Sequence, residues 1–151
     1  MDTALLTIGQ LFVGPTLHTA IFPGLQRKRF CEGRTLLSDA EFISRLGVPE
    51  GSHRFVAGAR EALARVCYIP ASVICPEDAP ASLARLVGDW DDLGVALELE
   101  AAFGISIDER LPRFTGWRFF WRGEAGPRTV GEWAVRVAEY LESRLHDDQV
   151  A

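Results

Sequence analysis

Three aspartates stand close together in the segment GDWDDLGVALELEAAFG, which covers residues 88–104: Asp89, Asp91 and Asp92. Clustered carboxylates are suitable ligands for hard cations such as calcium or magnesium. The segment lacks the ligand spacing of an EF-hand loop, however, and the three side chains do not all project to one side of a helix. Negative charge at the start of a helix is also favoured by the helix dipole. We therefore expect a solvated, acidic helix start and no metal site.

The residues that follow predict the helix that positions these aspartates. Their apolar side chains form a broad surface at helical spacing, and Gly104 is a typical C-terminal stop. The surface comprises Leu93, Val95, Ala96, Leu97, Leu99, Ala102 and Phe103. We expect the three aspartates in the first turn of this helix and a short extended link over residues 105–108 after it.

Other helix starts are marked by capping patterns. Ser38 and Glu41 form a capping-box pattern before a short helix outside the main bundle, and Thr129 with Glu132 repeats it before the last helix. From Ser52 an apolar stripe predicts a long helix. This stripe consists of Phe55, Ala59, Ala62, Leu63 and Val66. The apolar stripe of the last helix consists of Trp133, Val137, Tyr140, Leu141 and Leu145.

Between the long helix and the acidic one, three prolines predict an extended loop over residues 69–83. Val73 and Ile74 are expected to anchor this loop in the core. A further short helix is expected near Leu111. The pattern as a whole predicts an all-α fold, with no internal repeat or low-complexity tract.

This order of elements resembles the acyl and peptidyl carrier proteins over residues 53–145. The resemblance is carried by IPASVICPEDAPASL for the loop, LGVALELEAAFGISI for the second carrier helix and TVGEWAVRVAEYL for the last helix. More closely, GDWDDLGVALELEAAFGISI is similar to an uncharacterised bacterial group of carrier-like proteins with Gly-Asp-x-Asp-Asp in place of the serine motif. The resemblance implies an acyl-carrier-protein-like four-helix bundle with an N-terminal extension and an aromatic insertion before the last helix.

In the carrier family a serine at the start of the second helix bears a phosphopantetheine arm. Matching on Phe103 puts Asp89 at the serine position and Trp90 at the leucine that follows it. A carboxylate in that reaction would give a labile mixed anhydride, whereas a serine hydroxyl gives a stable phosphodiester. We therefore expect no phosphopantetheine. An unconventional carrier that uses another serine, Ser82 or Ser106, is the alternative.

A partner-binding surface is expected on the acidic helix and on an aromatic insertion. Basic partners bind carrier proteins along this helix. In this chain the contact would be made by Asp89, Asp91, Asp92 and Glu98. The insertion TGWRFFWRGEAGPR, residues 115–128, would place one aromatic face on the bundle or against a protein partner if it is extended. That face consists of Trp117, Phe119 and Trp121.

The charge distribution supports a basic protein partner and excludes general nucleic-acid binding. The formal net charge is −5, with residues 1–65 basic and residues 66–151 strongly acidic. A phosphate backbone would be repelled by the acidic part. The aromatic and arginine residues of the insertion could stack on bases, but their acidic surroundings disfavour this role.

The N-terminal segment is unusual because residues 3–26 contain no charged side chain, and Arg27, Lys28 and Arg29 follow directly. Glycines, prolines and threonines make it too polar for a typical spanning helix, and it lacks the pattern of a secretory signal. We expect an arm packed on its own domain or on a second subunit. Contact of this arm with the inner membrane is the alternative.

The remaining residues give no pattern of catalysis. His18, His53 and His146 have no metal-site spacing, and no nucleophile motif or phosphate loop is present. Three cysteines at irregular spacing favour a reducing cytoplasm, with Cys67 as a core side chain.

We therefore expect a non-enzymatic interaction or regulatory module that lacks the prosthetic-group serine. Residues 1–51 would form an N-terminal arm and short helix, residues 52–146 the carrier-like domain and residues 147–151 a tail. The alternatives are an unconventional acyl carrier and a membrane-associated adaptor anchored by residues 3–26.

Overall fold

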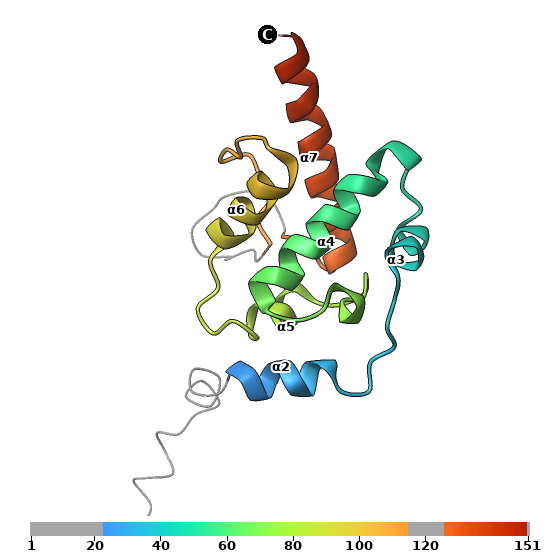
Figure 1. Ribbon diagram of the computed structural model, residues 1–151, viewed down its shortest axis with the longest axis vertical. Helices are drawn as coiled ribbons and strands as arrows, with labels where there is room; N and C mark the ends of the chain where they lie inside the picture. The colour runs from blue at the N-terminus through green and yellow to red at the C-terminus, as the bar shows by residue number, and fades with distance from the viewer. Residues whose placement is uncertain (1–22, 115–125, 151) are drawn as a thin grey trace, which may run out of the picture.

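The computed structural model describes residues 23–114 and 126–150, and this part of the chain is all-helical, without strands. The all-α expectation is therefore confirmed for these residues. The helices are α2 (Pro23–Cys31), α3 (Asp39–Leu46), α4 (His53–Cys67), α5 (Pro80–Ala84), α6 (Asp92–Phe103) and α7 (Val130–Val150), with single 3-10 turns η1 (Glu50–Ser52) and η2 (Ala71–Val73). Figure 1 shows α4 between α7, α6 and α3, with α2 lying across one end.

The long helix α4 is the centre of the core. The predicted stripe is confirmed, since Phe55, Ala59 and Leu63 are all at most 3% exposed. Helices α6 and α7 both pack against α4, and α7 contributes Trp133, Val137 and Leu141 at 0% exposure to the same core. Burying apolar side chains of this size stabilises a fold by roughly 1.5–3 kcal/mol each.

Helix α3 belongs to this core, so its predicted place outside the bundle is wrong. The predicted capping box is present: Ser38 Oγ accepts from the backbone N–H of Glu41, and the Glu41 carboxylate accepts from the backbone N–H of Ser38. Phe42 is fully buried against the core residues of α4. Arg60, a buried residue of α4, anchors this helix by hydrogen bonds to Asp39, the first residue of α3, and to the Leu37 carbonyl just before it.

A second arginine fixes the loop after α4. The guanidinium of Arg34 forms two hydrogen bonds with the Asp78 carboxylate, at 2.7 and 2.8 Å, and a third with the Val73 carbonyl. Val73 and Ile74 are buried, as expected. The extended conformation predicted over residues 69–83 is wrong for the turn η2 and for α5, where Pro80 occupies an early helical position that needs no N–H donor.

The acidic helix α6 is fixed at both ends. Gly104 adopts the left-handed conformation (φ 66°) and donates its N–H to the Glu100 carbonyl, which confirms the predicted stop. Near this end, Phe103 packs 5.3 Å from the Phe55 ring and lies over Gly58, where no Cβ could be accommodated without a shift. Residues 105–108, where we expected a short extended link, form neither helix nor strand. The short helix expected near Leu111 is absent, since residues 109–111 form only a turn.

The last helix begins as predicted after Thr129, whose Oγ1 accepts from the backbone N–H of Glu132. The Glu132 carboxylate accepts from Arg128, one residue earlier than a capping box requires. Helix α7 then continues through residues 147–150, where we had expected a tail.

The N-terminal part described by the structure contains a helix that the sequence patterns did not predict. Residues 23–31 form α2, which has no buried residue and lies on the surface. None of the helices in the two described ranges is long and apolar enough to cross a membrane. The first part of the predicted arm, residues 1–22, is outside the described residues.

Candidate functional site

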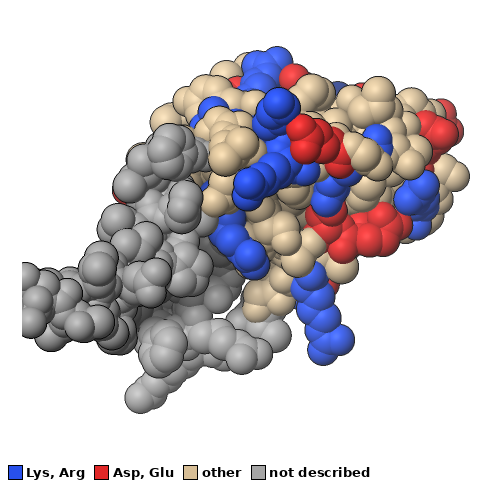
Figure 2. All heavy atoms as spheres, turned by 90° about the horizontal axis from the view of Figure 1, so that it is seen from below, with Lys and Arg blue, Asp and Glu red and all other residues tan. Residues whose placement is uncertain are grey.

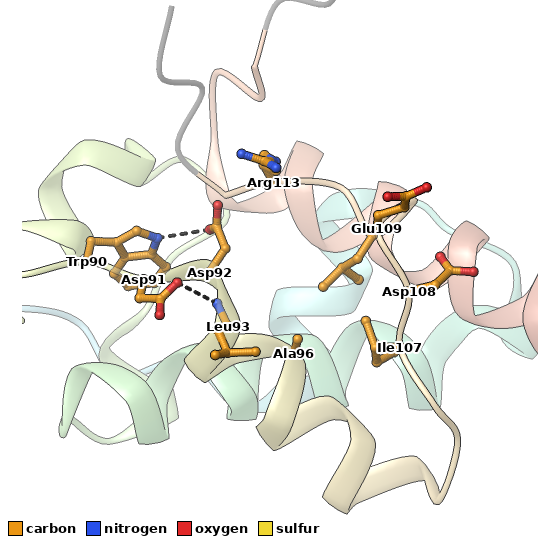
Figure 3. Close-up of a pocket in the computed structure, with 10 residues that line it drawn as sticks. Trp90, Asp91, Asp92, Leu93, Ala96, Ile107, Asp108, Glu109 and Arg113 are labelled. Atoms are coloured by element: carbon orange, nitrogen blue, oxygen red, sulfur yellow. Dashed lines mark hydrogen bonds between the residues drawn. The ribbon is translucent and has the colours of Figure 1, made fainter. Parts of the chain in front are cut away.

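An open groove with a volume of about 490 Å³ lies beside the start of α6. Residues 90–96 form one wall, and residues 107–113, in the link between α6 and α7, form the other. Figure 3 shows Asp91 and Asp92 on one side and Asp108 and Glu109 on the other. The lining residues are Trp90, Asp91, Asp92, Leu93, Ala96, Ile107, Asp108, Glu109, Leu111 and Arg113.

Asp92 stabilises one wall of the groove through hydrogen bonds to Trp90 and Phe114. Its Oδ1 accepts a hydrogen bond from Trp90 Nε1 at 2.9 Å and another from the backbone N–H of Phe114 at 3.2 Å (Figure 3 shows the first). The Trp90 ring lies 4.8 Å from that of Phe114, which in turn meets Trp133 edge-on at 5.1 Å. This aspartate therefore connects the start of α6 to the aromatic core beneath α7.

The other two aspartates differ from Asp92 and from each other. Asp91 is the N-cap of α6, and its Oδ1 accepts from the backbone N–H of Leu93 at 3.0 Å. Asp89 is exposed in the bend before the helix. The prediction that all three lie in the first helical turn is therefore wrong, because α6 starts only at Asp92 and Asp89 precedes its cap.

The apolar surface of α6 is buried on one side only. Val95 and Leu99 are in the core at 1% and 0% exposure, whereas Leu93 and Leu97 are 59% and 55% exposed. Ala101, one further turn along the same line of the helix, is also exposed. Because apolar residues occur on all sides of α6, their spacing does not indicate which of them face solvent, and this exposed stripe was not predicted from the sequence.

Asp108 gives the opposite wall a firmly fixed negative charge. Its carboxylate accepts hydrogen bonds from the side chain and backbone of Arg110 and from the Tyr140 hydroxyl. These bonds, led by that of the Arg110 guanidinium, lower the pKa of Asp108 to about 2. Arg144 Nη1 lies 3.8 Å away. Local sequence patterns did not identify Asp108 as part of a site, because its partners come from α7 and from the link.

Of the other expected site residues, Glu98 is paired within the fold. Its carboxylate lies 3.5 Å from Arg65 of α4. The predicted aromatic face of Trp117, Phe119 and Trp121 lies outside the described residues, so its relation to the groove is not part of the structure.

The serines considered as substitute attachment sites lie apart in the fold. Ser106 is exposed in the link, directly before the groove residue Ile107, while Ser82 is half-buried in α5. No group of three or more His, Cys, Asp or Glu side chains in residues 23–114 and 126–150 is arranged to hold a metal ion. The buried Cys67 has its pKa raised to about 12 by desolvation, which makes its thiol a poor nucleophile.

Comparisons with protein-family models, curated proteins and solved structures found no match to this chain.

Proposed function

We propose that this chain is a non-enzymatic protein-interaction module that docks an apolar, basic segment of a partner on α6 and the adjacent groove. The observation that carries this proposal is the pair Leu93 and Leu97, more than half exposed and one helical turn apart. Large apolar side chains grouped on one exposed helix face are typical of protein contacts. An amphipathic segment that lies along α6 would cover both leucines.

The charge around the two leucines supports a basic partner. The groove is lined by four carboxylates, those of Asp91, Asp92, Asp108 and Glu109, and by one guanidinium, that of Arg113. Because Asp108 is paired with Arg110 at 2.9 Å and lies 3.8 Å from Arg144, Asp91, Asp92 and Glu109 contribute most of the negative charge that a partner would meet. Complementary charge of this kind raises the association rate and disfavours acidic competitors.

The surface is also held in place before a partner arrives. The N-cap Asp91 fixes the start of α6, and the Glu100 carboxylate accepts from the backbone N–H of Ile107 at 2.7 Å, which fixes the link to its end. Phe103 is seated over Gly58 of α4. A helix constrained in these ways has little conformational entropy left to lose on binding.

A titration with designed peptides tests this proposal. The probe is a fluorescent amphipathic peptide of leucines and lysines, and the matched control replaces every lysine with glutamate. We expect the lysine peptide to bind and to shift the amide NMR signals of Leu93, Leu97 and the groove residues, with no binding of the glutamate peptide. Equal binding of both peptides, or shifts confined to other surfaces, would refute the proposal.

A further inference from the structure

Helix α2 is a second surface, formed by residues other than those of the α6 site. Its last two residues, Phe30 and Cys31, are partly buried against the core. Arg27 adds a second attachment, since its Nε donates to the Leu86 carbonyl at 3.3 Å and its guanidinium lies 4.7 Å from the centre of the Tyr68 ring. None of its residues is buried. The helix therefore exposes Leu25, Lys28 and Arg29 on its outer side.

The exposed side chains of this surface combine positive charge with apolar groups. Lys28 is 74% exposed, with the Glu32 carboxylate 4.0 Å away, and Arg29 is also exposed. Leu25 and Tyr68 are 45% and 72% exposed. Figure 2, which looks at the molecule from below the view of Figure 1, shows several Lys and Arg side chains near the middle of this face among uncharged residues, with most Asp and Glu side chains to the right of them. The acidic chain thus has a locally basic face.

The position of Tyr68 on this face is set by the backbone. It is the C-cap of α4 in the left-handed conformation (φ 55°), and its N–H donates to the Arg65 carbonyl. The left-handed backbone ends the helix at this residue. The Tyr68 ring lies at the surface, with the Arg27 guanidinium over it. Tyrosine rings and basic side chains are both favoured at the level of lipid headgroups.

We propose that the α2 face, formed by Leu25, Arg27, Lys28, Arg29 and Tyr68, binds the surface of an anionic lipid bilayer. Basic residues supply the attraction to the headgroups, and Leu25 and Tyr68 supply the apolar contact that a purely electrostatic surface lacks. The chain directly before this face supports the choice of a membrane over an acidic protein, because residues 3–22 contain no charged side chain. The face would hold the protein at the membrane while α6 binds its partner.

Vesicle flotation of the full-length chain tests this inference. We expect flotation with vesicles of phosphatidylcholine and phosphatidylserine, little with phosphatidylcholine alone, and a decrease in binding as salt is added. The double variant Lys28→Glu/Arg29→Glu should lower the partition coefficient at least about 30-fold, since two basic residues contribute about 1 kcal/mol each and about 1.4 kcal/mol corresponds to tenfold. Leu25→Ser should lower it about fivefold.

The matched control is Arg54→Glu/Arg128→Glu, which makes the same change in net charge at exposed arginines of the first turn of α4 and of the segment before α7. It should keep most of the flotation. The inference is overturned by unchanged flotation of Lys28→Glu/Arg29→Glu, by equal flotation with neutral vesicles, or by binding to soluble polyglutamate without binding to vesicles. Thermal melts of each variant show that the fold is intact.

Discussion

The guanidinium of Arg60 is 1% exposed and lies 2.7 Å from the carboxylate of Asp39, which is 60% exposed. A buried cation thus reaches from the centre of the core to an anion at the surface. Its Nη2 donates to the carbonyls of Leu37 and Ile74, and its guanidinium lies 4.5 Å from the centre of the Phe42 ring. Three chain segments, α4, residues 37–42 and the loop at Ile74, therefore meet at one side chain. Arg60 Nε has no hydrogen-bond partner within the described residues.

We expect the two members of this pair to contribute unequally to stability. Arg60→Ala would leave two buried carbonyls without donors and open a cavity, so the free energy of unfolding should fall by about 3 kcal/mol. Asp39→Asn removes the counter-charge of a buried cation but leaves the guanidinium bonded to both carbonyls and the exposed position 39 open to water, so it should cost about half as much, roughly 1–2 kcal/mol. Urea denaturation of both variants measures this. Similar losses for the two would contradict the account.

The low pKa of Asp108 predicts part of the acid sensitivity of the fold. Its folded pKa of about 2 is below the ordinary value of 3.8, so the ionised carboxylate stabilises the folded state above about pH 4, and this contribution is lost as the pH falls toward 2. Asp108→Asn should therefore show a smaller fall in Tm than the wild type between pH 4 and pH 2. Glu139→Gln, which alters an exposed carboxylate of α7, is the control. Parallel curves for Asp108→Asn and the wild type would exclude this role.

Thiol labelling should separate the three cysteines. Cys67 is 0% exposed, and its pKa of about 12 leaves almost no thiolate at pH 8. Cys31 and Cys75 are half-buried. We expect iodoacetamide to modify these two in the native protein and Cys67 only after unfolding, as read by peptide mass mapping. Native labelling of Cys67 at a rate similar to theirs would show that the core opens readily.

The aspartate at position 89 predicts that the carrier modification does not occur. Incubation with coenzyme A and a phosphopantetheinyl transferase should leave the intact mass unchanged, because a carboxylate does not form the stable phosphodiester of a serine. A phosphopantetheine adduct would favour the alternative of an unconventional carrier. The variants Ser82→Ala and Ser106→Ala would then identify the attachment site.

Local patterns in the sequence predicted those parts of the fold that depend on neighbouring residues. The capping box at Ser38, the apolar stripe of α4 and the stop at Gly104 each follow from residues within a few positions of one another. Helix α2 was missed because its sequence PGLQRKRFC has no apolar stripe. The helix expected near Leu111 was wrong, as residues 105–114 instead follow contacts with α6 and α7, including those of Asp92 and Tyr140.

The candidate site was predicted only in part, for a similar reason. The acidic start of α6 was visible in the sequence, but the use of Asp92 to hold Trp90 and Phe114 depends on residues up to 22 positions apart. The placement of α4 decides which leucines of α6 face solvent. The groove forms because the link after α6 returns toward α7.

The affinity of the leucine and lysine peptide for the double variant Leu93→Ser/Leu97→Ser tests the central proposal most directly, because it removes the apolar contact without changing the charge. Both side chains are mostly exposed, so the variant should unfold within about 0.5 kcal/mol of the wild type. Leu36→Ser, at a leucine that is 65% exposed elsewhere on the surface, is the matched control. Fluorescence anisotropy should show at least a tenfold higher Kd for the α6 variant, corresponding to about 1.4 kcal/mol, and an unchanged Kd for Leu36→Ser. An unchanged Kd for the α6 variant would contradict docking on α6.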